Sequence, residues 1–262
     1  QVILADFPAV PPADLDIEIL ETSALEDMNG VCRIIAACQD VGVTFSLDDF
    51  GTGYSSLSYL KRLSVNQLKI DQTFVRDMLD DPDDLTILEG MISLAGAFRR
   101  QVIAEGVETV AHGRRLLQLG CERAQGYGIA RPMPAADVPA WLASWQPDPS
   151  WRDTRPLRRE YLPSLFALVE YRAWVAALEA YLAGDGDLPA HESGTCELMQ
   201  WIRSAGERHP DQRVAFVDLE QRHQRTHALA ATLTDLHAHG KSAEAKARLD
   251  ELHTLRDDLQ NH

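Results

Sequence analysis

The stretch DDFGTGYSSL at residues 48–57 decides the fold of this chain. It follows an apolar, β-branched run at residues 41–47 and leads into a segment of helical character from Ser55 to Leu63. Two adjacent carboxylates repel one another unless a cation lies between them. We therefore interpret Asp48 and Asp49 as part of a divalent-metal site at the carboxyl end of a strand.

Further strand-like runs lie on both sides of this stretch, and segments of helical length separate them. They cover residues 15–22, 65–71, 102–109 and 124–128. Such alternation is typical of a parallel sheet, most often one closed into a barrel. Polar residues at the carboxyl ends of the strands then meet on one face, where catalysis takes place. The sequence therefore predicts an α/β fold built as a partial TIM-like (β/α) barrel.

Five ordered motifs resemble those of the EAL family of cyclic di-GMP phosphodiesterases. They are EILETS, DDFGTGYSSLSYL, LKID, AEGVET and QGYGIARPMP, spread over residues 15–134. The resemblance implies a metal-dependent enzyme that hydrolyses one phosphodiester bond of cyclic di-GMP and gives linear pGpG. It implies two Mg2+ or Mn2+ ions as cofactors, and their oxygen-rich ligand set suits these hard cations.

The resemblance also implies a role for each matching residue. Glu18 and Asp48 match ligands of the first metal, with Asp48 bridging, and Asp49 and Glu105 match ligands of the second. Lys69 matches the lysine near the attacking water, so Lys69 and Glu105 are the expected catalytic residues. Two metals about 3.5–4 Å apart lower the pKa of a bound water and hold both the attacking and the leaving oxygen.

Three further residues match supporting positions of the family. Glu21 and Glu108 match acids that hold the DDFGTG loop in place, and Gln125 matches a residue of the nucleotide pocket. Each residue alone has a plainer explanation. The aspartate pair would suit a solvated turn, Lys69 a surface position, and Glu108 an exposed helix start, where the dipole favours acids. Only the joint pattern points to the family.

Part of the family pattern is missing from this sequence. Before Glu18 the sequence has neither an E-A-L tripeptide nor a V-N-x-S strand, the positions that supply the other first-metal ligands and a substrate-binding arginine. About half the barrel is therefore expected to be absent, and the chain alone is expected to be inactive. Either the chain is a fragment, or the missing strands come from elsewhere, because half a barrel cannot close. The alternative function is a degenerate EAL domain that binds nucleotide or a partner without hydrolysis.

The composition excludes several classes of protein. The 262 residues are 45% apolar, enough for one or two domains. The net charge of −15 argues against a nucleic-acid polymer as partner. Four cysteines without C-x-x-C spacing favour a reducing compartment, so we expect a cytoplasmic location. No apolar run reaches the roughly 20 residues of a membrane helix.

The sequence character changes after residue 147. We expect the partial EAL barrel at residues 1–147, a linker rich in proline and charge at 148–159, and a helical domain at 160–262. Apolar stripes of helical period run through residues 165–182, 196–205, 214–236 and 243–259. They predict an all-α, antiparallel four-helix bundle. We also expect the chain to form a homodimer.

Inside this predicted bundle, His223 and His227 are four residues apart and lie on one helix face. Two imidazoles in this spacing can share one metal. Together with the C-x-x-x-x-W-I segment that begins at Cys196, they resemble the chemoreceptor zinc-binding (CZB) family. The resemblance implies a Zn2+ site formed by Cys196, His223 and His227, and a zinc- or redox-sensing role for the bundle.

One position departs from the CZB pattern. The family has a histidine three residues before a tryptophan, whereas here Tyr171 stands three residues before Trp174. The fourth zinc ligand is therefore left open between Tyr171, His191 and water. The plainer explanation is that both histidines lie on a partly polar helix face while Cys196 belongs to the core. The bundle would then serve self-association.

Overall fold

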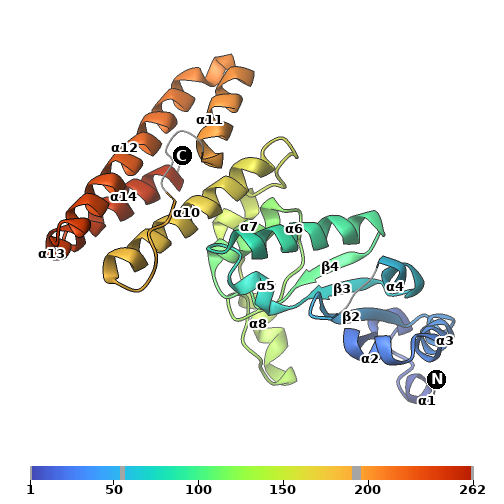
Figure 1. The fold of residues 1–262 in the computed structure, drawn as a ribbon. Helices are drawn as coiled ribbons and strands as arrows, with labels where there is room; N and C mark the ends of the chain where they lie inside the picture. The colour runs from blue at the N-terminus through green and yellow to red at the C-terminus, as the bar shows by residue number, and fades with distance from the viewer. Residues whose placement is uncertain (1, 54–56, 191–195, 261–262) are drawn as a thin grey trace. The chain divides into compact units, whose positions relative to one another are not determined.

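The computed structural model describes residues 2–53, 57–190 and 196–260, so Tyr54, Ser55, Ser56 and His191 lie outside the described residues. The chain forms two compact units. The first contains residues 1–79 and 83–157, and the second contains residues 80–82 and 158–262. Figure 1 labels the helices and strands of both.

The first unit contains a four-stranded parallel sheet in the order β1-β2-β3-β4, with β2, β3 and β4 side by side in Figure 1. The strands are β1 (Asp16–Leu20), β2 (Thr44–Phe50), β3 (Gln67–Ile70) and β4 (Gln101–Ala104). The helices between and after them are α2 (Glu21–Glu26), α3 (Met28–Gln39), α4 (Leu57–Arg62), α5 (Gln72–Arg76), α6 (Pro82–Ala97) and α7 (Val110–Gln118). The unit also has α1 (Val2–Asp6), α8 (Val138–Ser144) and α9 (Pro149–Asp153). The predicted α/β fold with a parallel sheet is confirmed.

The central strands are buried on both faces, as parallel strands covered by helices require. In β2, Phe45, Ser46 and Leu47 are all buried, and the next strand buries Leu68 and Ile70. Strand β1 is different, because among the described strands it pairs only with β2. It therefore leaves one backbone edge unpaired in the described sheet, the kind of edge that invites further strand pairing.

All four strands have other bounds than the sequence pattern predicts; β1 already ends at Leu20, where α2 follows, and the largest differences are in β2 and β4. Strand β2 starts only at Thr44, because Gly42 adopts a positive φ of 94° in a turn, and it continues through both aspartates. Strand β4 ends at Ala104, well before residue 109, because Gly106 also takes a positive φ, 72°. Beyond it, only an isolated bridge from Ala104 to Ala124 stands where a further strand was predicted.

The stretch predicted as a linker is partly helical, since α9 lies within it. Its Trp151 donates an indole hydrogen bond of 2.8 Å to the Val110 carbonyl. The same ring lies so close to Gly113 that a Cβ there would come within 2.5 Å of it. This part of the chain is thus packed against α7. The domain boundaries themselves stay a prediction.

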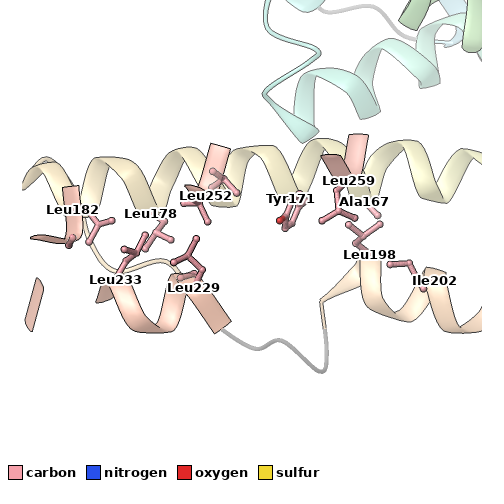
Figure 2. Packing of buried hydrophobic residues seen from close by; sticks show 13 residues of the cluster. Ala167, Tyr171, Leu178, Leu182, Leu198, Ile202, Leu229, Leu233, Leu252 and Leu259 are labelled. Carbon is pink, nitrogen blue, oxygen red and sulfur yellow. The ribbon is translucent and has the colours of Figure 1, made fainter. Parts of the chain in front are cut away.

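The second unit is helical, as predicted. Its helices are α10 (Leu162–Ala183), α11 (Glu197–Arg208), α12 (Arg213–Ala238), the short α13 (Ser242–Lys246) and α14 (Leu249–Gln260). Helix α12 packs against α11 and α14, and α10 contacts the same three helices. Figure 2 shows Leu178 and Leu182 of α10 close to Leu229 and Leu233 of α12. Burial of these leucines stabilises the bundle by roughly 1.5–3 kcal/mol for each fully buried side chain.

Two glycines provide a matched test of the first unit. Gly51 follows β2 with φ of 105°, and a Cβ there would come within 2.2 Å of the Met91 methyl group. Gly51→Ala is expected to lower the free energy of unfolding by more than about 1 kcal/mol. Gly90 lies in α6 with open space around it, so Gly90→Ala should raise it by about 0.5–1 kcal/mol. Urea unfolding followed by circular dichroism measures both, and a stabilising Gly51→Ala would contradict the described loop.

Candidate metal centres

Strand alternation gathers charged side chains on one face of the sheet. Successive strand residues point to opposite faces, and parallel register pairs Glu18 with Ser46 and Lys69 with Ile103. Leu47 and Leu68, which are paired in register, occupy the opposite, apolar face. The side chains on the polar face include Glu18, Asp48, Lys69 and Glu105.

The Lys69 ammonium lies at the centre of this face. Its Nζ is 2.8 Å from Asp48 Oδ1, 2.7 Å from Glu105 Oε1 and 2.9 Å from Glu18 Oε1. Lys69 is only 5% exposed, so little water screens these contacts. Burial alone would lower its pKa, but the hydrogen bonds to the three carboxylates outweigh burial and raise the pKa above the usual lysine value.

Asp49 joins the cluster through an irregularity of β2. In a regular strand its side chain would point away from that of Asp48. Here the register between β2 and β3 shifts between Leu47 and Phe50, and Asp49 has a φ of 54°. As a result, one carboxylate oxygen from each of Asp48, Asp49 and Glu105 lies within 4.8 Å of the other two. Glu18 reaches Lys69 but is not part of this tighter group.

The electrostatics of the group favour a bound cation. Burial, followed by the neighbouring carboxylate of Asp48, raises the pKa of Asp49. Burial also raises the pKa of Glu105, against the opposing effect of Lys69. A divalent cation would relieve both effects, and three carboxylate oxygens are donors that suit Mg2+ or Mn2+. The residues present therefore fit the metals that the motifs imply.

The loop after β2 is tied to Glu21. This glutamate is fully buried, and its Oε2 accepts a hydrogen bond of 2.9 Å from the Gly51 amide. A Cβ on Gly53 would come within 2.7 Å of Glu21 Oε1, so the loop passes directly over the carboxylate. Glu108 is exposed and makes no hydrogen bond to the described loop residues 51–53. Its loop-anchoring role stays a prediction.

A cavity of about 480 Å³ opens beside Glu105, and Gln125 lines it. The Gln125 side chain donates a hydrogen bond of 2.6 Å to Glu105 Oε1. Tyr127 and Arg131 also line the cavity, with the guanidinium 4.7 Å from the ring centre. Both residues belong to the QGYGIARPMP motif and were not expected to have a role, although an aromatic ring and a cation next to Gln125 suit a nucleotide.

Asp71 is a third residue near the site for which the motifs led us to expect no role. Its charge contributes to the raised pKa of Asp49, and its Oδ1 caps α5 by accepting from the Thr73 amide at 2.9 Å. The signal was present, because Asp71 is an acid directly after a strand in the LKID motif. The rule that polar residues at the carboxyl ends of parallel strands meet on one face applies to Asp71 as well.

A second cluster lies in the bundle. One donor atom from each of Cys196, His223 and His227 lies within 4.8 Å of the other two. Cys196 Sγ is 2.9 Å from His223 Nε2, and the two imidazole rings are 4.4 Å apart. The structure therefore brings the three predicted zinc ligands together. The plainer explanation placed the histidines on a partly polar helix face, whereas here both are buried and His223 contacts Cys196.

Burial sets the protonation of this cluster. It lowers the pKa of His223 to about 4, so the imidazole is neutral at pH 7 and its lone pair is free to bind a metal. It raises the pKa of the Cys196 thiol, so binding of a metal there would release a proton. Thiolate and imidazole are the donors that Zn2+ prefers. Burial also raises the pKa of Tyr171.

The chain belongs to the EAL family, since the model of the EAL domain matches residues 1–132. The model of the chemoreceptor zinc-binding domain matches residues 172–234. The resemblance inferred from the motifs is thus confirmed for both regions. The first match includes the acidic cluster on the sheet, and the second includes Cys196, His223 and His227.

Among the relatives is MucR of Pseudomonas aeruginosa, described as a bifunctional diguanylate cyclase and cyclic di-GMP phosphodiesterase. It is 41% identical over 135 residues, which are 52% of this chain and 20% of MucR. A solved structure of the MucR phosphodiesterase in complex with c-di-GMP is 40% identical to this chain and has a TM-score of 0.50. The match covers 52% of this chain and 54% of the MucR chain in that structure. The solved EAL domain of Mycobacterium smegmatis DcpA is 41% identical to this chain and has a TM-score of 0.51. The match covers 54% of this chain and 63% of the DcpA chain. The chain spans about a fifth of the length of the curated relatives.

None of the helices in the described part of the chain combines the length and apolar character that crossing a membrane requires. Two further expectations, that the chain forms a homodimer and that it is located in the cytoplasm, stay predictions.

Lys69 is expected to be important for the stability of the first unit. Lys69→Met removes the ammonium and leaves its carboxylate partners without compensation. In the presence of EDTA, unfolding in urea should show a loss of about 1–3 kcal/mol, below the value for a fully buried pair because Glu18 is partly exposed. Added Mn2+ should restore part of this loss. The exposed Lys61→Met is the control, and equal stability of the two variants would contradict the described network.

Proposed function

We propose that the first unit provides catalytic residues of a phosphodiesterase that hydrolyses cyclic di-GMP to pGpG with two Mg2+ or Mn2+ ions. The observation that carries this proposal is the convergence of Asp48, Asp49 and Glu105 around one point, with Lys69 beside them. The metals would supply an activated water and stabilise the leaving oxygen. Glu18, Asp48, Asp49 and Glu105 would be their ligands, with Asp48 bridging.

Lys69 would act on the reacting atoms. Its raised pKa keeps the ammonium charged at neutral pH, and burial prevents it from moving into solvent. With its carboxylate partners engaged as metal ligands, Lys69 would have N–H groups available for the attacking water or a phosphate oxygen. A donor fixed in this way stabilises negative charge as it develops, without reorganisation during the reaction.

The cavity beside Glu105 would receive part of the nucleotide. The Arg131 guanidinium can form paired hydrogen bonds with a phosphate, and the Tyr127 ring, 59% exposed, offers a surface for a guanine base. Gln125 connects this cavity to the metal site through its hydrogen bond to Glu105. Substrate contact at Gln125 would therefore also position a metal ligand.

We further propose that hydrolysis needs strands beyond those of this sequence. The sequence contains no E-A-L tripeptide, and only three carboxylates form the tight group in the described residues. The unpaired edge of β1 also carries exposed apolar side chains, since Ile17 is 37% and Leu20 47% exposed. The 262-residue chain alone is therefore expected to form no pGpG above background.

The catalytic assignment is tested by completing the barrel. The N-terminal barrel half of the MucR phosphodiesterase, joined ahead of residue 1, should give a chimaera that converts cyclic di-GMP to pGpG when Mg2+ or Mn2+ is present. Asp48→Asn in this chimaera should lower turnover at least about a hundredfold, because the bridging ligand loses its charge. The exposed Asp40→Asn is the matched control.

The outcomes separate the two functions. Near-normal turnover of the Asp48→Asn chimaera would refute the metal assignment. A chimaera that binds cyclic di-GMP but does not hydrolyse it would favour the nucleotide-binding module instead. Formation of pGpG by the 262-residue chain alone would show that added strands are unnecessary.

We also propose that the bundle binds Zn2+ through Cys196, His223 and His227 and that zinc occupancy regulates the phosphodiesterase. The support is the convergence of the three donors and the match of residues 172–234 to a zinc-binding family. The neutral state of His223 at pH 7 means that no proton must leave that imidazole before a metal binds.

Zinc binding is tested by titration against a chromophoric chelator. The chain should bind zinc stoichiometrically, whereas His223→Ala should lose at least about tenfold in affinity, because one donor is removed. His239→Ala, which removes an exposed imidazole at the end of α12, is the control. Equal affinities of the His223 and His239 variants would exclude this site.

A further inference from the structure

The bundle cluster offers three donors for a metal that usually takes four. Among the described residues, no fourth histidine, cysteine, aspartate or glutamate joins Cys196, His223 and His227. Structural zinc sites are closed by four protein ligands, whereas a site with three protein ligands keeps one position for water or another small molecule. The groups next to the three donors therefore decide what would fill the fourth coordination position.

Tyr171 lies next to the cluster. Its ring centre is 5.3 Å from that of His223 and 6.5 Å from that of His227. The residue is 5% exposed, and its hydroxyl makes no hydrogen bond of normal geometry. The nearest polar group is the Thr226 hydroxyl, which donates to the Arg222 carbonyl at 3.2 Å and can offer the phenol only an acceptor. A buried hydroxyl without a hydrogen bond of normal geometry is costly, so this phenol has hydrogen-bonding capacity left for a ligand.

A cavity of about 250 Å³ lies beside Tyr171 and two of the metal donors. Its lining includes Tyr171, Trp174, Cys196 and His227. The two aromatic rings stack with centres 5.9 Å apart, and Trp174 is 4.6 Å from the His227 ring. These walls suit a small planar molecule. Two acidic residues, Glu170 and Glu197, also line the cavity and disfavour an anion.

Resting on the zinc site proposed above, we infer that the bound ion keeps one exchangeable coordination position facing this cavity, which takes water or a small neutral nitrogen donor such as imidazole. Tyr171 is then a positioning residue that hydrogen-bonds the exchangeable ligand and is not itself a zinc ligand. Such a zinc ion is held by three protein donors. The bundle would release it at a higher free zinc concentration than a closed four-ligand site.

The experiment uses the complete 262-residue chain loaded with Co2+ or Zn2+ and imidazole as the probe. The visible spectrum of the Co2+ form should change with saturation as imidazole is added, and the apparent zinc affinity should rise about tenfold. Tyr171→His supplies an imidazole from the chain itself, so its zinc affinity should exceed that of the parent by at least about tenfold, without any response to imidazole. Circular dichroism confirms that each variant is folded.

Two variants test other sources of a fourth ligand. Tyr171→Phe keeps the ring and removes the oxygen, and it should keep the zinc affinity within about threefold and retain the response to imidazole. His191→Ala should behave in the same way. A loss of about tenfold or more in either variant would identify a protein ligand and overturn the inference. A parent protein that binds zinc but does not respond to imidazole would overturn it too, whereas failure to bind any metal would overturn the zinc site itself.

Discussion

The first unit depends on the buried ammonium of Lys69. Glu18 and Asp48 come from β1 and β2 and Glu105 directly follows β4, and their negative charges would push the sheet apart at this point. A single nitrogen in contact with all three offsets that repulsion inside the protein. Desolvation of the lysine opposes this arrangement, yet the pKa of Lys69 still rises, so the three contacts dominate. The sheet can therefore carry an acidic face before any metal binds.

The irregularity of β2 serves the same acidic face. A regular strand would place Asp48 and Asp49 on opposite sides of the sheet, and only one would reach the cluster. The positive φ of Asp49 costs backbone energy, of the order of 1–3 kcal/mol for such conformations. The next residues are anchored by Glu21 through the Gly51 amide. Local strain and a buried carboxylate thus cooperate to turn two adjacent acids toward one point.

Much of this arrangement follows from the sequence, and the exceptions have physical causes. Alternation of apolar runs predicts the parallel sheet, and the rule that polar strand ends converge predicts the meeting of Asp48 with Glu105. The exact ends of the strands are harder to predict. Gly42 delays the start of β2 and Gly106 follows the end of β4, both with positive φ values that apolar patterns do not reveal. The cavity at Tyr127 depends on how loops fold over the sheet, which residue type alone does not encode, whereas Asp71 stands at a strand end as Asp48 does.

The cluster in the bundle also touches the start of a helix. Cys196 is the N-cap of α11, and its sulfur accepts a hydrogen bond of 3.4 Å from the Met199 amide. A thiolate accepts such a bond more strongly than a thiol, and the positive end of the helix dipole favours it. Any event that changes the charge on this sulfur therefore also changes how firmly the first turn of α11 is wound. The Cys196 sulfur thus links metal binding or oxidation in the cluster to the stability of the first turn of α11.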